Sequence, residues 1–530
     1  MSPRKLQLTL ATLCVCAFAV NVDTTLVNVA LPRLASELGA STRELQWIVD
    51  AYTLVFAALV LSAGSLSDRF GRRGALITGL VIYGTANGAA ALTTSAGALI
   101  ATRALMGVGA AVIFPTTLSI ISNVFTDRRE RAKAIGLWGA ATGAAVALGP
   151  IIGGALLESF SWQSTFLAKV PLAIAAIALV LWVVPTSRDP HAPRLDLPGF
   201  GLSTAGVGLI VFAVIEAPTA GWESTQTLGL FAAAALLLCL FGAWEKRAAE
   251  PMLDLGLFRN PRFSGASFSI AVAFFSLAGF IFLIVQYMQV IKGWSPLETG
   301  VRTLPVAIAV GISSVLGTEI AVRRGSKVIV TLGLLCMAAG LGWVALVQTA
   351  GTSYLVIAGQ MLFLGAGMGL TSAPATESIM GSVSIAKAGV GSALNDMSRE
   401  LGSTLGVAVV GSVFASAYAA ELSTGAARAL PAAAVTHARE SIGAAYATAH
   451  ELASKGAPRA AAELHHVAST GFLNGLSTGC LVVAGTCVAG AFLCAVVLPS
   501  QPPARPEEPS DTSGESVPGL RGLVSAGAQA

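Results

Sequence analysis

Apolar stretches of about 18 to 25 residues recur along the whole chain, and they constrain its fold more than any other feature. A helix of that length crosses the roughly 30 Å hydrocarbon core of a bilayer and satisfies its own backbone hydrogen bonds there. Only 11% of the 530 residues are charged, which is too few to coat several soluble domains. The sequence therefore predicts an all-α polytopic membrane protein.

The apolar stretches predict fourteen transmembrane helices. Most of the 32 Lys and Arg residues fall in the loops and tails that share a side with the N-terminus. Because cytoplasmic loops are enriched in these residues, both ends of the chain are predicted to be cytoplasmic. The expected spans are residues 8–30, 45–65, 75–95, 98–121, 133–157, 164–184, 198–216, 226–244, 263–290, 299–320, 327–347, 353–378, 389–417 and 471–498.

The remaining polar stretches and residue types exclude several classes of protein. Residues 418–470 would form an outer loop with short helices, and residues 499–530 a disordered cytoplasmic tail rich in Pro, Glu, Ser and Gly. No GxxxxGK[ST] motif occurs, so no ATP-driven engine is expected. The five histidines lie between the expected spans, so carboxylates are left as proton carriers. The cysteine spacings suit neither a zinc site nor a disulfide framework.

A tight basic turn, GSLSDRFGRR at residues 64–73, follows the second expected span. An ordinary positively charged loop would explain the charges alone. The complete spacing G-x-L-x-D-R-x-G-R-R, however, resembles the loop motif of the major facilitator superfamily, where it acts as a conformational latch between the second and third helices. The residues that would carry this role are Gly64, Asp68, Arg69, Gly71, Arg72 and Arg73.

Three further segments resemble motifs of the same superfamily. Residues 99–111 resemble its fourth-helix motif around Arg103, with Met106 in place of the usual glutamine. Residues 23–32, DTTLVNVALP, resemble the first-helix motif of the fourteen-helix drug:proton antiporter branch. A fifth-helix motif found in exporters and generally absent from importers is matched by Gly136, Gly149, Pro150, Gly153 and Gly154.

The resemblance implies the major facilitator fold, in which two six-helix halves carry related loops. The N-terminal half would be residues 1–197 and the C-terminal half residues 263–498, with two inserted helices and a cytoplasmic linker in residues 198–262. The substrate site would be an apolar midplane cavity between the halves. Its expected linings are Phe274, Phe275, Phe280, Gln286, Tyr287, Met288, Gln289, Met361 and Phe363.

Asp23, Asp50 and Arg103 fall inside expected spans at similar depth. An ionisable group at a helix centre costs about 2.5–3.5 kcal/mol to insert, so each is a functional candidate. Counting about 1.5 Å per residue, all three lie roughly 8–10 Å below the outer ends of their helices. Arg103 can hold one carboxylate ionised while the other exchanges a proton; a static pair that locks the helices is the alternative. The resemblance favours coupling, because drug antiporters of this branch use acids at both positions.

Asp396, Arg399 and Glu400 share one face of the thirteenth span. They either pair with one another or leave Asp396 to bind a drug cation. Glu319 and Glu377 lie near cytoplasmic helix ends, where they would be interfacial residues, with a gating role as the alternative.

Lys169 departs from the family pattern, in which a polar neutral residue precedes the Val170-Pro171 pair. A lysine inside an apolar span either extends toward the membrane surface or pairs with an acid.

These features predict proton-coupled export of drugs or other amphipathic, cationic small molecules across the cytoplasmic (inner) membrane by alternating access. The protein would be a multi-pass, monomeric secondary transporter and not an enzyme. Its partners would be small-molecule substrates and the lipid bilayer, with no nucleic acid, ATPase subunit, metal or cofactor besides the proton gradient. Export of an endogenous lipid or secondary metabolite, and a non-transport membrane protein, stay as alternatives.

Overall fold

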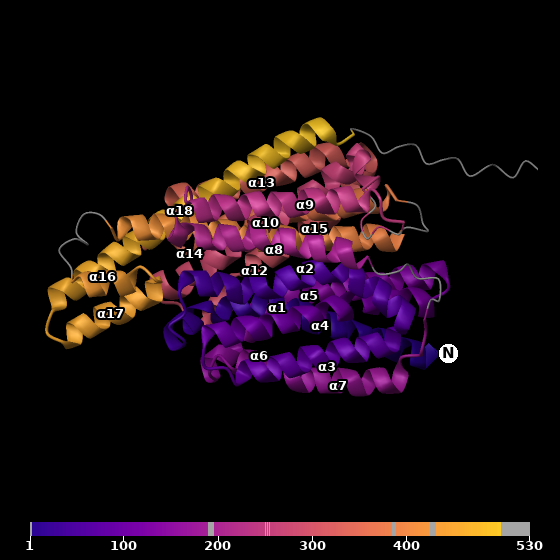
Figure 1. Ribbon diagram of the computed structural model, residues 1–530, viewed down its shortest axis with the longest axis horizontal. Helices are drawn as coiled ribbons and strands as arrows, with labels where there is room; N and C mark the ends of the chain where they lie inside the picture. Colours follow the sequence, from indigo (N-terminus) through magenta and orange to yellow (C-terminus); the bar gives the residue numbers. More distant parts are fainter. Residues whose placement is uncertain are drawn as a thin grey trace, which may run out of the picture.

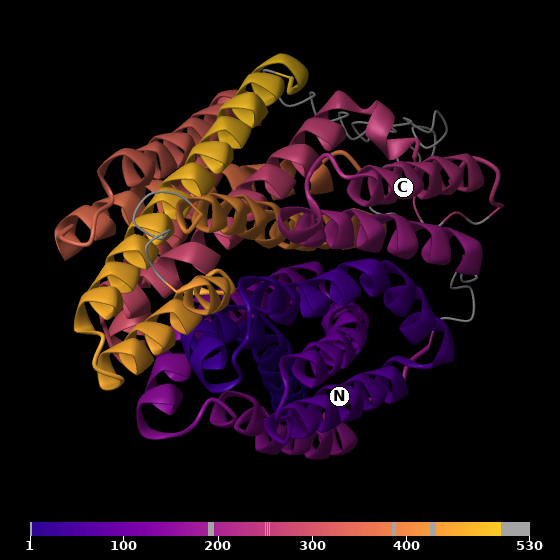
Figure 2. The ribbon, with the colours of Figure 1, turned by 60° about the vertical axis from the view of Figure 1, so that its left-hand side comes forward.

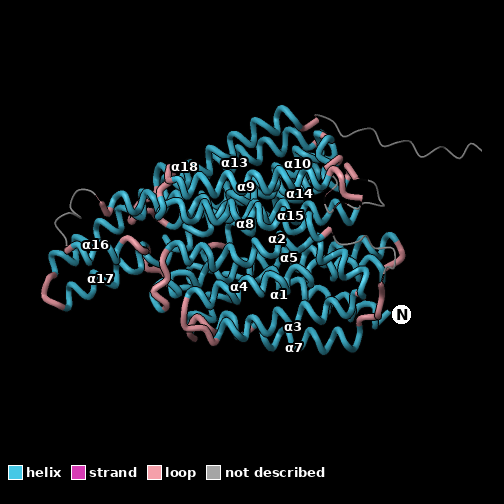
Figure 3. Tube along the Cα trace, in the orientation of Figure 1, coloured by secondary structure: helices cyan, strands magenta, loops and turns pink. Residues whose placement is uncertain are grey.

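The computed structural model of the protein describes residues 3–188, 196–249, 251, 253, 255–383, 388–423 and 431–499. Every regular element within these ranges is a helix (Figure 3). Thirteen helices of the described part are long and apolar enough to cross a membrane. The 29-residue helix α2 (Thr42–Phe70), which includes residues whose side chains are not described, is a further long helix. The all-helical membrane fold is thus confirmed, and the count of fourteen spans stays a prediction.

The N-terminal helices gather on one side of the molecule (Figures 1 and 2). We call the end of the bundle that holds the N-terminus and the end of α18 the terminal side, and the opposite end, where α16 and α17 project, the cap side. The helices of this half are α1 (Pro3–Glu37), α2, α3 (Arg72–Ala91), α4 (Ala96–Val124), α5 (Arg128–Ser159), α6 (Ser164–Leu167) and α7 (Lys169–Val183).

The C-terminal helices gather on the other side. They are α10 (Pro261–Gln286), which follows the short 3-10 helix η1 (Leu257–Arg259), the π-helical turn η2 (Tyr287–Ile291), α11 (Pro296–Arg302), α12 (Leu304–Arg324), α13 (Ser326–Val347), α14 (Tyr354–Met380), α15 (Ala388–Glu421) and α18 (Pro458–Val497).

Two of the expected single spans are broken helices. Residues 164–184 form α6 and α7 with a break at Ala168, and residues 299–320 form α11 and α12 with a break at Thr303. A proline stands at the start of the second helix in both cases, Pro171 as the third residue of α7 and Pro305 as the second of α12. Proline lacks a backbone N–H and fits the first turn of a helix but not its interior, so a new helix begins there.

The inserted pair, α8 (Leu197–Ala220) and α9 (Thr225–Glu245), packs on itself and covers the line where α2 meets α15. Asp196 joins the two inserted helices, because it caps α8 at Gly199 N and accepts a hydrogen bond from Trp244 Nε1 at 2.7 Å. A small apolar cavity of about 90 Å³ lies beneath the pair, with Leu54 and Met397 in its wall.

The cap side carries a helical extension formed by α16 (Ala432–Ala438), α17 (Ile442–Ser454) and the first turns of α18. Residues 418–423 and 431–470 are thus largely helical, and His437, His450, His465 and His466 lie on α16, α17 and α18. The extension touches both halves. Tyr418 donates to Ala438 O at 3.0 Å, and Glu440 O accepts from Thr42 N at 2.9 Å.

Candidate functional site

A cluster of three charged side chains lies inside the N-terminal half, where α1, α4 and α7 meet. Arg103 donates from one guanidinium nitrogen to Asp23 Oδ2, and Lys169 donates to Asp23 Oδ1. The Asp23 and Arg103 side chains are fully buried, and Lys169 is 4% exposed. One carboxylate therefore holds two cationic side chains away from solvent.

Small residues on α4 allow this cluster to form. A Cβ atom at Gly107 would lie 2.6 Å from Tyr52 O on α2, and one at Gly109 would lie 2.8 Å from Gly79 O on α3. Only glycine permits such close helix contacts, which are typical of membrane helix packing. Arg103, one helical turn before Gly107, is thereby held against α2, and its Nε donates to Ile48 O at 2.8 Å.

An aromatic ring lies against each of the two cationic side chains. The Arg103 Cζ atom lies 4.5 Å from the centre of the Tyr52 ring, and Lys169 Nζ lies 4.8 Å from that of Phe166. The Tyr52 hydroxyl donates to Val20 O at 3.1 Å and that of Tyr83 to Ala19 O at 2.8 Å, so these rings also tie α2 and α3 to α1. The surroundings are apolar, and in such surroundings Coulomb forces are stronger than in water.

Asp50 lies close to this cluster but does not join it. Its side chain is fully buried, and no group of the described residues donates a hydrogen bond to either carboxylate oxygen. Arg103 is bound instead to Asp23 and to Ile48 O, two residues before Asp50. An isolated buried carboxylate is very unfavourable in its ionised form, so the neutral carboxylic acid is the form that fits this position.

In the C-terminal half the charged residues of α15 form a separate group. Arg399 Nη1 lies 3.6 Å from Asp396 Oδ1, and Arg399 Cζ lies 4.6 Å from the centre of the Phe274 ring. Phe274 is thus an expected cavity residue that contacts a charged group. Phe280, Tyr287, Met288 and Met361 are instead buried in the apolar core.

A pair of threonine hydroxyls connects α2 and α15 across the two halves. Thr53 on α2 and Thr404 on α15 have their Oγ1 atoms 2.9 Å apart. Thr53 Oγ1 also contacts Asp50 O, and Thr404 Oγ1 contacts Glu400 O. This link across the halves was missed in the sequence, because nothing in it indicated that α2 and α15 are neighbours.

Glu319 and Glu377 occupy the terminal side, as their positions near helix ends suggest. Glu319 pairs with Arg323 at 2.5 Å, and Glu377 pairs with Arg262 at 3.4 Å. Both glutamates are about half exposed, with side-chain exposures of 57% and 43%. An open cavity of about 640 Å³ lies beside Glu319 and Arg323, between α12 and α14. Neither acid belongs to the buried clusters.

The basic segment at residues 64–73, expected to be a tight turn, is mostly helical: residues 64–70 end α2, Gly71 alone separates the two helices, and Arg72 begins α3. The segment contacts the end of α7. Gly71 has φ +120°, a conformation that glycine adopts without strain. Arg72 N donates to Ser187 O at 2.9 Å, and the Arg73 guanidinium donates to Leu181 O. Arg69 is exposed, Gly64 lies in ordinary contact with Pro115, and the side chain of Asp68 lies outside the described residues. The segment at residues 64–73 is thus attached to α7, and its proposed latch role stays a prediction.

The glycines of α5 allow close packing both within the N-terminal half and, near the cap side, between the two halves. Cβ atoms at Gly149 and Gly153 would meet Thr25 and Leu26 of α1, so these two glycines pack within the N-terminal half. A Cβ atom at Gly154 would lie 2.5 Å from Pro296 O of α11, across the boundary between the halves. Reciprocally, a Cβ at Gly300 would lie 2.2 Å from the carbonyl oxygen of Pro150, whereas Gly136 faces open space.

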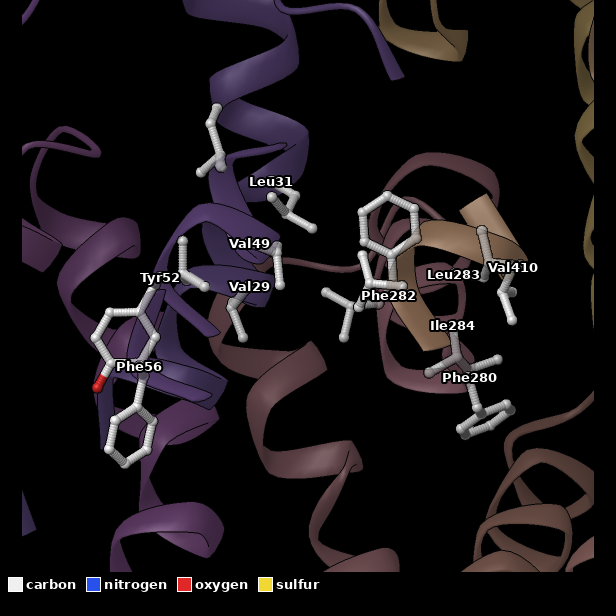
Figure 4. Close-up of a cluster of buried hydrophobic side chains, with 14 of the residues drawn as sticks. Val29, Leu31, Val49, Tyr52, Phe56, Phe280, Phe282, Leu283, Ile284 and Val410 are labelled. Atoms are coloured by element: carbon white, nitrogen blue, oxygen red, sulfur yellow. The ribbon is translucent and has the colours of Figure 1, made fainter. Parts of the chain in front are cut away.

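Other contacts between the halves also lie toward the cap side. Gln46 donates to Ala408 O at 2.9 Å, and Gln289 donates to Val29 O at 2.9 Å. Buried side chains of α1 and α2 face those of α10 and α15 in one apolar cluster that includes Val29, Val49, Phe282 and Val410 (Figure 4). Toward the terminal side α5 has little contact with α12, although it packs closely on α11. The bundle is therefore sealed at its cap side.

Two helical halves that meet along a sealed side, with charged residues buried inside, are the arrangement expected of a membrane transporter. The chain belongs to the Major Facilitator Superfamily, whose family model matches residues 13–407. It is a multi-pass membrane protein.

Relatives of the chain are named as drug-efflux or drug-resistance proteins. It is 34% identical to the multidrug efflux pump LfrA of Mycolicibacterium smegmatis over 495 residues, which cover 93% of this chain and 97% of that protein. It is 35% identical to the multidrug resistance protein Stp of Mycobacterium tuberculosis over 414 residues, covering 78% and 77%. A solved bacterial homologue of the human lysosomal transporter Spinster, inward-facing and unoccupied, has a TM-score of 0.65 at 15% identity and covers 95% of this chain and 100% of that one. This last likeness supports the fold alone.

Proposed function

We propose that the protein exports amphipathic, cationic small molecules across the cytoplasmic membrane in exchange for protons. The relatives' names support drug efflux, and the terminal side, which carries the basic loop at residues 64–73, is the cytoplasmic side in this proposal. The seal at the cap side then makes the structure closed to the outside. No ATPase subunit, cofactor or nucleic acid is needed, and a monomer suffices.

The observation that supports proton coupling is the difference in bonding between the two buried acids, Asp23 and Asp50. Asp23 is bound by two cations, whereas Asp50 has no hydrogen-bond partner among the described residues. Protonation of Asp23 would break two charge-assisted contacts, while Asp50 loses none. Asp50 is therefore the acid that exchanges a proton at least cost.

The transport cycle follows from these roles. When the bundle opens at its cap side, Asp50 takes up a proton from outside, and the neutral side chain can be buried. When the bundle opens at its terminal side, a cationic substrate enters and Asp50 releases its proton to the cytoplasm. The ionised carboxylate then balances the charge of the substrate. Asp396, beside Arg399 on α15, would contact the substrate from the C-terminal half.

The test is transport by purified protein in liposomes with an imposed pH gradient. The gradient alone is expected to drive accumulation of a fluorescent cationic dye, without ATP or sodium. A requirement for ATP would refute the proposal, and a requirement for sodium would replace the coupling ion.

A drug-susceptibility panel on deletion and overexpressing strains tests the cargo. Unchanged susceptibility to all cationic drugs, with a change in exported lipid or metabolite, would indicate that the same mechanism exports an endogenous substrate.

A further inference from the structure

The charges around Asp23 do not balance. Asp23 contributes one negative charge, while Arg103 and Lys169 together contribute two positive charges when all three groups are ionised. The cluster then carries a net charge of +1 in a place that is closed to solvent. Ionised groups are buried at a cost of several kcal/mol each unless they are compensated, so one group is expected to change its charge state with ease.

Among the described residues, the groups that face Lys169 offer no second anion. Asp23 contacts it from α1, and Arg103 of α4 lies on the other side of that carboxylate. On α3 the buried titratable residue is Tyr83, whose hydroxyl donates to Ala19 O. Arg72 and Arg73 stand at the far, terminal end of α3. The helix α6 has no titratable residue and presents the Phe166 ring, and α7 has no other titratable residue.

Of the three charged groups, the lysine is the one that can change its protonation state at least cost. The arginine guanidinium keeps its proton in proteins. A proton placed on Asp23 would weaken both of its contacts and leave a net charge of +2. If Lys169 loses a proton instead, the cluster becomes neutral, and the amine still has two N–H groups with which to donate to Asp23 Oδ1.

We propose that Lys169 is a second proton-carrying residue of the exporter, acting beside Asp50. This inference rests on the proposed proton-coupled export of cations. When a cationic substrate enters between the halves, the Lys169 ammonium gives one proton to water and keeps the electron pair on Nζ. When the substrate has left toward the outside, the amine takes a proton from water on that side. The lysine in place of the family's polar neutral residue thus adds a charge that alternates with that of the cargo.

The first test uses purified protein with Asp50→Asn, so that residue 50 cannot exchange a proton. The probe is tetraphenylphosphonium, and its affinity is titrated from weakly acidic to weakly alkaline pH. A unit charge about 10 Å from a bound cation, at an effective dielectric constant of about 20, changes affinity by roughly tenfold. Affinity in Asp50→Asn is therefore expected to rise roughly tenfold as pH increases.

Two double variants distinguish an effect of the charge of Lys169 from an effect of its packing. With Asp50→Asn/Lys169→Gln, affinity is expected to stay at the high value at every pH. With Asp50→Asn/Lys169→Arg, which keeps a cation beside Asp23, it is expected to stay at the low value. The inference is overturned if Asp50→Asn shows no pH dependence or if Lys169→Gln leaves that dependence unchanged.

A second readout covers the case in which these double variants fail to fold or to bind. Tetraphenylphosphonium is added to otherwise wild-type protein in weakly buffered detergent solution, and the protons released per bound cation are counted with a pH indicator. Lys169→Arg is expected to release fewer protons than the wild type, and equal release overturns the inference. Dye accumulation by the wild type under a pH gradient, measured in parallel, shows separately whether the proposed function itself holds.

Discussion

Asp23→Asn tests most sharply how the buried cluster holds the N-terminal half together. The substitution hardly changes the volume of the side chain, but it replaces one carboxylate oxygen by an NH₂ group. Either Arg103 or Lys169 then meets a donor instead of an acceptor. We expect the variant to reach the membrane in reduced amount and to unfold at a lower temperature than the wild type.

The size of the effect follows from burial. Removing one partner of a buried ion pair costs about 3–5 kcal/mol, because an uncompensated charge is left behind. That is a large share of a typical folding stability of about 5–15 kcal/mol. The double variant Asp23→Asn/Arg103→Gln removes the permanent cation, and Lys169 can stay as a neutral amine. It is therefore expected to recover most of the lost stability.

The assay is thermal unfolding in detergent, followed by the fluorescence of the eight tryptophans. Asp50→Asn is the matched control, since it makes the same chemical change in a carboxyl group with no hydrogen-bond partner among the described residues. It should cost far less stability than Asp23→Asn while reducing proton-coupled transport. The reasoning is refuted if the two variants unfold alike, or if adding Arg103→Gln gives no recovery. Recovery of proton-coupled transport together with stability in the double variant would show Asp23 to be purely structural.

Three further outcomes are expected. A reporter inserted after Ser423 should report the external side and one fused after Ser500 the cytoplasm; the opposite result at either site removes the proposed orientation. Asp68→Asn should leave membrane insertion intact but slow transport several-fold if the loop is a latch, and an unchanged rate would leave it a topology signal. Gly154→Val should hinder closure at the cap side, because its Cβ would lie 2.5 Å from Pro296 O, and so increase labelling of cysteines placed there. Gly136→Val, in open space, is the control, and equal labelling in both would contradict this role.

Much of the fold could be predicted from the sequence, because a helix has a fixed rise and a bilayer a nearly fixed thickness. The same geometry predicted Asp23 and Arg103 at one depth, and the structure brings them into contact. The sequence could not tell whether Arg103 would bind Asp23 or Asp50. That choice depends on the rotation of α2, which is set by close packing such as that of Tyr52 O on Gly107.

Lys169 shows a different limit. The sequence marked it as unusual and left open whether it reaches the membrane surface or pairs with an acid. Its partner depends on α7 lying against α1, and helices so far apart in the chain become neighbours only through the tertiary fold. The break at Ala168, which starts α7 at the lysine itself, also went unpredicted. Both features are consequences of packing rather than of composition.

The central claim, exchange of a proton for a cationic substrate, is tested most directly by running the exchange in reverse. Liposomes with purified protein and equal pH on both sides receive an outward gradient of tetraphenylphosphonium, with the membrane potential clamped. The wild type should move protons inward as the cation leaves, seen as acidification of the lumen by a trapped pH dye. Asp50→Asn should show less acidification, because Lys169 is then the remaining proton carrier, and Asp50→Asn/Lys169→Gln should show none. Cation efflux through the wild type without any proton movement would contradict the account.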